Sequence, residues 1–413
     1  MSLDPNKTIN RQRLGRVSVA MVMRIFSPKG GLELYAHRLV EGLLERGCQV
    51  TIFCEEHLST FTHPYLSVVQ LETPARVIKK RERLAYYFRE FSRLVQEHGP
   101  FDIINSQQVC IEKVDVAHFH NPSVARMSRN GKWWERWINR FKLQVVPSYK
   151  ERNKYDRLLA SRARLLVFPS NISKDDFERT YDLLSFRNSA SHLVAYPGVD
   201  SLGHDISSGE DSSPTGKETE APINFLFVGK GYRKKGLDVL LSACQILARK
   251  GYAFTLSIAG LRAKPLDRIR LNVLGLTKQV KYLDFQNDMT SLYLNAQAIV
   301  FPSRIDAFGM APLEAMRYGV VPIVSRASGV SEILTHRKDA LILEDHLNPK
   351  KLAGLMSSLL ENHETNAALS RQARLTAANY RWERMVDSVL KAHAMILQTA
   401  SDTEPNKLEL YRI

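Results

Sequence analysis

Two acidic residues in one short segment are the strongest candidates for chemistry in this 413-residue chain. Residues 301–318 read FPSRIDAFGMAPLEAMRY, which places Asp306 in a loop after an apolar run and Glu314 in the helical pattern that follows. One acid on a loop and one inside the next helix can face the same ligand from different heights. The alternative is that Asp306 caps the loop and Glu314 is a solvated helix residue.

The backbone between these two acids is suited to binding an anion. Gly309 allows a ligand to approach the main chain closely, and Pro312 suits the first turn of a helix. The amides of Gly309, Met310 and Ala311 should therefore point at whatever lies beyond the strand end. The segment predicts a site for a phosphate group or a similar anion.

A second loop supplies positive charge. The stretch FVGKGYRKKG places Lys230, Lys234 and Lys235 after an apolar run and before a helical pattern. Fixed cations beside helix amides stabilise the negative charge that builds up on a departing phosphate group. A solvated basic loop is the alternative, and the preceding run with Gly229 argues against it. The spacing does not settle which two lysines bind.

Two polar stretches in the first half of the chain also follow apolar runs. PKGGLELYAHRL places Gly30 and Gly31 between a strand and a helix, although such a pair can also be a tight turn. VAHFHNPS places His118 and His120 at a strand end, and His118, which closes the strand, is the preferred candidate to face a ligand. A buried, hydrogen-bonded histidine is the alternative.

Aromatic and basic side chains are interleaved in residues 130–157, which contain three of the four tryptophans. The main candidates there are Trp133, Trp134, Trp137, Arg136 and Arg140. This composition favours contact with an anionic membrane or a phosphorylated glycolipid. Nucleic-acid binding or an ordinary helix face remain alternatives.

The elements that must position these residues alternate between strands and helices in both halves. The first half predicts strands at 17–26, 50–53, 102–105, 114–119, 165–170 and 192–200, with helices at 31–46 and 77–98. The second half predicts strands at 223–229, 254–260, 280–285, 298–303, 320–325 and 340–343, with helices from 236 and at 349–361, 364–377 and 382–398. This rhythm is typical of parallel α/β sheets, whose ligands bind at the carboxyl ends of the strands.

The chain length and a polar stretch divide the protein into two domains. We predict an N-terminal Rossmann-like domain at 1–200, a linker or long loop at 201–222, and a second such domain at 223–381. A helix at 382–399 should pack back on the first domain, and 400–413 should form a flexible tail.

Bulk composition indicates an ordinary globular protein with a basic surface. Lys and Arg number 58 against 43 acidic residues, giving a net charge of +15, which favours phosphorylated or anionic partners. The four cysteines show no metal-ligand spacing, so we expect free thiols. No run is apolar enough to span a membrane and none resembles a signal sequence. We therefore expect a cytoplasmic protein that can bind the inner face of the cell membrane as a peripheral protein.

The motifs at 301–318 and 227–236 resemble those of the retaining family 4 glycosyltransferases, which have the two-domain GT-B fold. The resemblance covers the chain from about residue 16. It implies that Asp306 touches hydroxyls of the donor sugar, although that family commonly has Glu there. It further implies that Glu314 binds the nucleotide ribose and that the backbone around Tyr282 and Leu283 bonds the base.

The same resemblance assigns the donor diphosphate to the remaining motif residues. These are Lys230, Lys234, Lys235, Gly309, Met310, Ala311, Gly30 and Gly31. Catalysis would then depend on Asp306, Lys235 and His118, with no metal and no cofactor besides the nucleoside diphosphate sugar, a UDP-sugar being favoured. The segment after the histidines is more weakly similar to glucosyltransferases of the lipopolysaccharide core.

The expected function is therefore transfer of a hexose from a nucleotide-sugar donor to a saccharide or glycolipid acceptor, with lipopolysaccharide core as the favoured acceptor. An anionic membrane surface is a further expected partner, and nucleic acid is not. A nucleotide-sugar epimerase of the GT-B type is one rival. A basic nucleic-acid-binding protein is the other.

Overall fold

A sheet of seven parallel strands organises the first half of the chain, with the order β5-β3-β1-β6-β7-β8-β9. The computed structural model describes residues 16–72, 78–79, 82–183, 191–200, 222–286 and 288–400. The strands are β1 (Ser18–Val22), β3 (Gln49–Cys54), β5 (Leu66–Gln70), β6 (Ile103–Gln107), β7 (Val116–His118), β8 (Leu165–Phe168) and β9 (Ser191–Val194). A separate parallel pair is formed by β2 (Ile25–Phe26) and β4 (Glu56–His57).

Alternating side chains of these strands pack into two layers of helices. Val19 and Met21 of β1 belong to the core that includes α1, whereas Ala20 and Val22 belong to the core on the opposite face. The helices of this half are α1 (Gly31–Glu45), α2 (Arg83–His98), α3 (Arg126–Arg129), α4 (Trp133–Val145), α5 (Pro147–Arg162) and α6 (Asn171–Tyr181). Fully buried strands covered on both faces explain the continuous apolar runs of the sequence.

A second parallel sheet of six strands organises the other half, with the order β12-β11-β10-β13-β14-β15. Its strands are β10 (Ile223–Val228), β11 (Phe254–Ala259), β12 (Val280–Tyr282), β13 (Ala298–Phe301), β14 (Val321–Ser325) and β15 (Leu341–Leu343). Its helices are α7 (Leu237–Arg249), α8 (Pro265–Leu274), α9 (Thr290–Asn295), α10 (Met310–Met316), α11 (Pro349–Glu361) and α12 (His363–Ala378), with a 3₁₀ turn η6 (Gly329–Ile333). The neighbours β10 and β13 carry the two loops in which the sequence places most of the chemistry.

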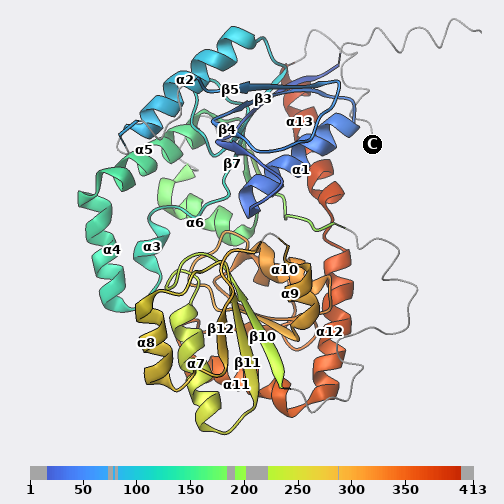
Figure 1. The fold of residues 1–413 in the computed structure, drawn as a ribbon. Coiled ribbons are helices and arrows are strands. Elements are labelled where there is room, and N and C mark those ends of the chain that lie inside the picture. The colour runs from blue at the N-terminus through green and yellow to red at the C-terminus, as the bar shows by residue number, and fades with distance from the viewer. Residues whose placement is uncertain are drawn as a thin grey trace, which may run out of the picture.

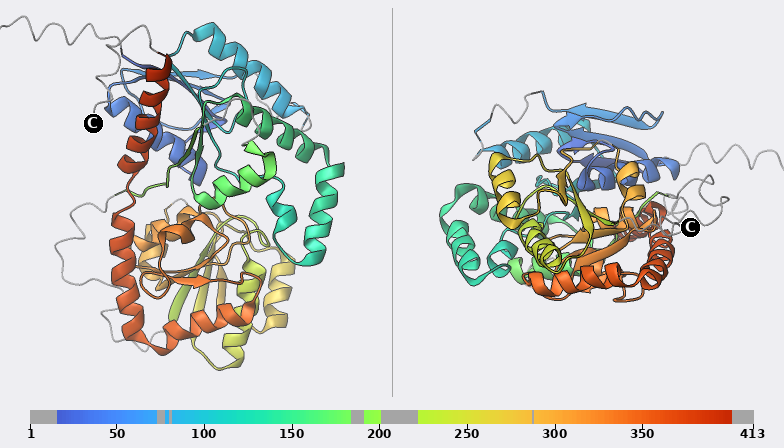
Figure 2. Two further views of the ribbon diagram at one scale, coloured as in Figure 1. Left: turned by 180° about the vertical axis from the view of Figure 1, so that it is seen from behind. Right: turned by 60° about the horizontal axis from the view of Figure 1, so that its bottom comes forward.

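The last helix, α13 (Trp382–Ala400), leaves the second domain and runs along the first, as Figures 1 and 2 show. Its apolar side packs on α1, where a Cβ at Gly42 would lie 2.6 Å from Val386. Arg46 at the end of α1 forms an ion pair of 2.5 Å with Asp387. Close contact at a glycine and a partly buried ion pair fix the helix against the first domain.

Helices α3 and α4 extend from the first domain beside the second on the side away from α13 (Figure 1). Asn130, which follows α3, donates a hydrogen bond of 2.9 Å to the carbonyl of Arg304 in the second domain. Glu135 of α4 lies 3.2 Å from Arg233 and 3.3 Å from Arg304. The two domains are therefore joined on one side by α13 and on the other by polar contacts.

The predicted α/β architecture with two doubly wound domains is confirmed, and the differences concern element ends. Helix α2 begins at Arg83 where we predicted 77, and β9 ends at Val194 where we predicted 200. The predicted linker at 201–222, apart from Pro222, and the tail after Ala400 lie outside the described residues. None of the described helices is long and apolar enough to cross a bilayer.

Candidate active site

The two loops that follow β10 and β13 meet, and they bring a lysine to an aspartate. Lys235 Nζ forms a short ion pair with Asp306 Oδ2, and the two side chains are only 19% and 16% exposed. These residues are 71 positions apart in the sequence. Because neighbouring parallel strands end at the same edge of a sheet, the two predicted motifs form one site.

Backbone contacts hold these two loops together. Arg304 N–H donates to the carbonyl of Lys234 at 3.0 Å, and the Ser303 hydroxyl donates to the same carbonyl at 3.3 Å. Gly236 has φ +77°, and a Cβ there would lie 2.0 Å from the carbonyl of Pro302. Only glycine permits so close an approach, so the loop that carries Lys235 is fixed against the loop that carries Asp306.

The start of α10 lies at the junction with the first domain. Gly309 precedes the helix with φ +97°, and a Cβ there would lie 2.8 Å from the ring of Phe301. Met310 contacts the first domain, where a Cβ at Gly31 would lie 3.6 Å from its side chain. The predicted Gly30-Gly31 loop and the predicted amides at 309–311 are therefore neighbours, one from each domain.

Glu314 projects from α10 and is held by a tyrosine. The Tyr293 hydroxyl donates to Glu314 Oε2 at 2.8 Å. Burial raises the pKa of Glu314, and the bond from Tyr293 and the charge of Arg317 oppose this rise. A carboxylate with one oxygen engaged keeps the other available to accept a hydrogen bond from a ligand hydroxyl.

The three lysines of the basic loop occupy different environments. Lys235 is paired with Asp306, whereas Lys230 Nζ lies 5.1 Å from the ring centre of Phe285, near the end of β12. More than a third of Lys234 is open to solvent, yet the surrounding protein lowers its pKa; the charge of Asp306 opposes this effect, and the charges of Lys235, Arg152 and Arg126 add to it. The structure therefore brings Lys234 and Lys235 together and leaves Lys230 apart.

The prediction that His118 faces a ligand between the domains is wrong, because its side chain is completely buried. Its Nε2 lies 3.2 Å from the Asn105 amide nitrogen, which is also 3.3 Å from Nε2 of His393 on α13. Burial lowers the pKa of His118, and the nearby His120 and His393 contribute. The buried structural histidine, the alternative considered above, describes His118.

His120, two residues further on, lies past the strand end and is only partly buried. Its Nε2 donates to Gln107 Oε1 at 2.7 Å, and its ring packs on Tyr35 at 4.5 Å between centres. Burial lowers the pKa of His120 to about 3, so it is neutral at physiological pH.

The residues proposed for the base show less free hydrogen-bonding capacity than expected. Leu283 N–H donates to the carbonyl of Ile258 at 2.8 Å, and its own carbonyl accepts a hydrogen bond from Gln286. Tyr282 closes β12 with a buried hydroxyl that has no hydrogen-bond partner among the described residues. The structure thus places both residues at a strand end but engages the Leu283 backbone within the protein.

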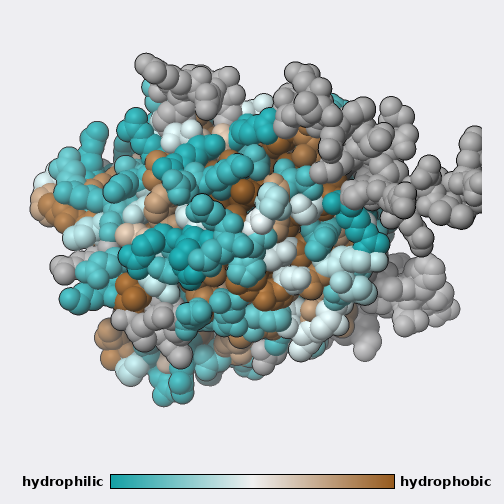
Figure 3. Space-filling model, turned by 90° about the horizontal axis from the view of Figure 1, so that it is seen from above, coloured by the Kyte–Doolittle hydropathy of each residue, from teal (hydrophilic) through white to brown (hydrophobic). Residues whose placement is uncertain are grey.

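Helix α4 exposes most of its apolar side chains. None of its residues is buried; Trp133 is 81% exposed, Trp137 69% and Phe141 55%. Trp137 and Phe141 stack in parallel with ring centres 6.3 Å apart. Seen from above the first domain, apolar residues gather at the edge of the molecule where α4 lies in Figure 1 (Figure 3). Arg136 and Arg140 are exposed on the same helix.

Trp134 differs from the other two tryptophans of α4. It lines a cavity of about 380 Å³ between α4 and the second domain, together with Arg233 and Lys234. The guanidinium of Arg233 lies 5.2 Å from its ring centre. Trp134 therefore belongs to the contact between domains, which corrects its assignment to the membrane-facing set.

A larger cavity of about 620 Å³ lies within the first domain, beside the ends of its central strands. Arg24, Tyr87, Gln107, Tyr155 and Asp156 are among the side chains that line it. Arginine, carboxylate, amide and tyrosine groups around one cavity match the hydroxyl-rich surface of a saccharide. The sequence does not single out these residues, because they come from the loop before β2 and from α2, β6 and α5 and share no local motif.

Sequence reasoning also missed several charged residues that join the two domains. Arg304 is 5% exposed and binds Asp238 at 2.6 Å as well as Glu135. Arg126 is 6% exposed and donates to the carbonyl of Ala327 at 2.8 Å. Burial of an arginine is unusual, especially without an ion pair, but burial is not visible in the sequence.

The chain has two parallel α/β domains, and loops at the ends of their strands meet near the Lys235–Asp306 ion pair and the start of α10. This arrangement is that of the GT-B class of protein. Comparison with known sequences supports this class over both halves. The family described as "Glycosyltransferase Family 4" matches residues 29–200, and that described as "Glycosyl transferases group 1" matches residues 210–376. The chain belongs to the glycosyltransferases of the GT-B type.

Individual relatives are distant but match over nearly their full length. A D-inositol 3-phosphate glycosyltransferase of Corynebacterium urealyticum is 23% identical over 404 residues, covering 88% of this chain and 90% of that protein. The crystal structure of WaaG, a glycosyltransferase involved in lipopolysaccharide biosynthesis, superposes with a TM-score of 0.72 at 17% identity, covering 92% and 99%. Alr3699/HepE of Anabaena in complex with UDP and glucose gives 0.61 at 15%, covering 92% and 100%.

Proposed function

We propose that this protein transfers a hexose, with retention of the anomeric configuration, from a nucleoside diphosphate sugar to a saccharide or glycolipid acceptor. The observation that carries the proposal is the Lys235–Asp306 ion pair beside the start of α10. A cation and unpaired helix amides at one point suit a diphosphate leaving group. The adjacent carboxylate suits hydroxyls of the sugar that the diphosphate carries.

The proposed chemistry depends on stabilising charge. As the bond between the anomeric carbon and the diphosphate oxygen breaks, negative charge collects on the diphosphate, and Lys235 and Lys234 neutralise it. The acceptor hydroxyl attacks from the face on which the leaving group departs and passes its proton to that group. Glu314, held by Tyr293, accepts hydrogen bonds from the ribose. UDP is the favoured nucleotide, and one structural relative, Alr3699/HepE of Anabaena, was solved with UDP and with UDP-glucose.

The first domain supplies the acceptor side in this proposal. Its cavity of about 620 Å³ has room and polar groups for one or two sugar units. The exposed aromatic and basic face of α4 would hold the enzyme at an anionic membrane surface, where a glycolipid acceptor is found. Lipopolysaccharide core is the favoured acceptor. The chain shares its fold with WaaG, a glycosyltransferase involved in lipopolysaccharide biosynthesis.

Two measurements test the proposal. A thermal-shift panel of UDP, GDP and ADP sugars should show one nucleotide that stabilises the protein, and NMR of the product should show a glycoside with the anomeric configuration of the donor. Conversion of the donor to an isomer without any acceptor would favour the epimerase instead. RNA binding that falls steeply with salt, with no nucleotide response, would favour the nucleic-acid-binding protein.

Metal independence is part of the proposal. Over the described residues, no three His, Cys, Asp or Glu side chains are placed to hold a metal ion. Because the lysines and the helix amides are proposed to neutralise the diphosphate, transfer should continue in excess EDTA, and loss of activity that magnesium or manganese restores would contradict this part.

A further inference from the structure

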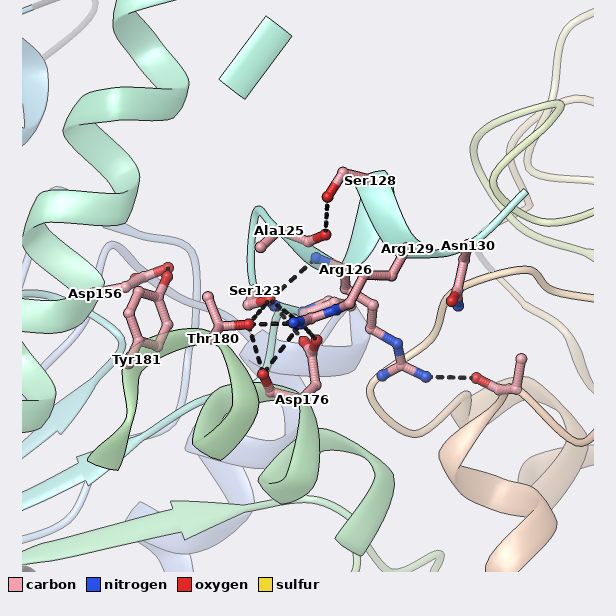
Figure 4. A network of polar contacts seen from close by, with 12 residues as sticks. Ser123, Ala125, Arg126, Ser128, Arg129, Asn130, Asp156, Asp176, Thr180 and Tyr181 are labelled. Carbon is pink, nitrogen blue, oxygen red and sulfur yellow. Dashed lines mark hydrogen bonds and ion pairs between the residues drawn. The ribbon is translucent and has the colours of Figure 1, made fainter. Parts of the chain in front are cut away.

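Arg126 is a buried arginine at the junction of the two domains. It begins α3 in the first domain, and only 6% of the residue is exposed. Figure 4 shows its side chain reaching from α3 to the second domain, where one terminal nitrogen donates to the carbonyl of Ala327 at 2.8 Å. The other terminal nitrogen is buried and has no hydrogen-bond partner in the described part of the chain.

The acids whose charges reach Arg126 are all engaged by other groups. Asp176 is bound by Arg129 at 2.5 Å and by the amide of Ser123 at 2.8 Å, as Figure 4 shows. Asp306 is paired with Lys235. Glu332 accepts hydrogen bonds from the first amides of α6, one of them the amide of Asn171 at 2.8 Å. Arg126 thus forms no ion pair of its own with a described residue.

Lys234 belongs to the second domain and is less buried than Arg126, since more than a third of it is open to solvent. Burial lowers its pKa, the charge of Asp306 opposes this effect, and the positive charges of Lys235, Arg152 and Arg126 add to it. Of these neighbours, Arg152 has Asp156 at 3.4 Å and Lys235 has Asp306. Among these four cations, the two that form no ion pair with a described residue are Arg126, from the first domain, and Lys234, from the second.

Arg126 is 6% exposed and forms no ion pair with a described residue, and its charge and that of Lys234 repel each other. This arrangement becomes favourable when an anion joins the two groups. An isolated buried charge loses its hydration, and a second charge of the same sign adds repulsion. Arginine presents a fork of donors that fits phosphate oxygens, and lysine adds a point charge. The pair is built for a group with several oxygens and more than one negative charge.

We propose that Arg126 and Lys234 together bind a phosphate group at the junction of the two domains, which makes Arg126 a substrate-binding residue from the first domain. This deepens the proposed function and rests on it, because the phosphate belongs either to the nucleotide donor or to a phosphorylated acceptor. The buried guanidinium admits its ligand when the domains separate. Binding then draws the domains together and completes the hydrogen bonding of the second terminal nitrogen.

Calorimetry with UDP and uridine tests the donor source. Arg126→Met and Lys234→Met should each weaken UDP about tenfold or more and leave uridine unchanged, since uridine carries no phosphate. Arg126→Lys should recover part of the loss. Arg371→Met on α12 is the matched control, because it removes one exposed arginine on another face of the second domain. If Arg126→Met does not fold, Arg126→Lys and Lys234→Met carry the test.

Inorganic phosphate added to the UDP-saturated protein tests the acceptor source. If the site serves an acceptor, the wild type should broaden the ³¹P signal of phosphate, the variants should not, and the UDP affinities should agree. The inference is wrong if the variants bind both UDP and phosphate as the wild type does. It is also wrong if the variants lose affinity for UDP and for uridine by the same factor, because Arg126 then only holds the two domains together. A wild type that binds no nucleoside diphosphate contradicts the proposed function, while phosphate binding to the free protein still decides the role of Arg126.

Discussion

Replacing Lys235 by Met separates the proposed site from an incidental ion pair. The substitution keeps the length and apolar stem of the side chain and removes the charge that faces Asp306. A hydrogen bond to a charged group contributes about 1.5–3 kcal/mol, so UDP should bind about 10–150 times more weakly. Loss of one fixed group that stabilises the transition state should lower kcat by a further factor of about 10²–10³.

The same substitution has a calculable effect on stability. Asp306 would keep its burial without its cation, and breaking a buried pair from one side costs about 3–5 kcal/mol. Both side chains retain some exposure, 19% and 16%, so we expect about 1–3 kcal/mol for this pair. Thermal unfolding measures this loss, calorimetry measures UDP binding, and initial rates with a saturating donor measure kcat.

Lys230→Met is the comparison that makes the result specific. Lys230 lies in the same loop, but its ammonium lies over Phe285 and is exposed. Its replacement should weaken UDP less than threefold, because an exposed charge is screened by solvent. If Lys235→Met keeps the UDP affinity and turnover of the wild type, or if Lys230→Met loses more than Lys235→Met, the geometry described here is not the donor site.

Three further predictions concern the surroundings of this site. Tyr293→Phe removes the hydroxyl that opposes the upward effect of burial on the pKa of Glu314, so that pKa should rise. Nucleotide binding needs the carboxylate, so on acidification it should be lost at a higher pH in the variant than in the wild type. A binding curve against pH whose acid limb does not move would contradict this. Glu135→Gln removes the charge that binds Arg304 across the domain junction, so the KM for the donor should rise. The loss of stability should be only about 1–2 kcal/mol, because Arg304 keeps its ion pair with Asp238. Equal kinetics for variant and wild type would show that this contact does not hold the domains together. Replacing Trp133 and Trp137 together by Ala should reduce flotation with anionic liposomes about tenfold and leave nucleotide affinity unchanged; undiminished flotation would place the membrane contact elsewhere.

The sequence was sufficient to predict the sheets and the meeting of the loops that carry Lys235 and Asp306. Continuous apolar runs separated by helical patterns define parallel strands, and strand ends collect at one edge of each sheet. Asp306 and Glu314 could be placed because one follows a strand and the other lies in a helix that begins at a glycine. The choice among Lys230, Lys234 and Lys235 could not be made, because the placement of Lys235 against Asp306 depends on the left-handed turn at Gly236 and on its contact with Pro302.

His118 and Trp134 show why side-chain surroundings were harder to predict. His118 does close a strand, but His393 of α13 lies close to it, because both rings contact the side chain of Asn105. His393 is 288 positions from Asn105 in the sequence. Trp134 adjoins Trp133 in the sequence, yet neighbours on a helix point about 100° apart. One tryptophan therefore meets solvent and the other meets Arg233. Both outcomes depend on chain segments that no local pattern specifies.

The two chain crossings between the domains lie together, and this determines how the domains can move. Gly198 packs so closely on the start of α13 that a Cβ would lie 2.2 Å from the backbone of Arg381, and Val199 and Arg381 form a parallel bridge. The contacts of Glu135 and Asn130 with Arg304 lie on the opposite side, where α3 and α4 approach the second domain (Figure 1). A rotation about adjacent crossings displaces the far side most. The contact of α4 with the loop that carries Lys234 and Lys235 is therefore the part of the junction most sensitive to domain opening.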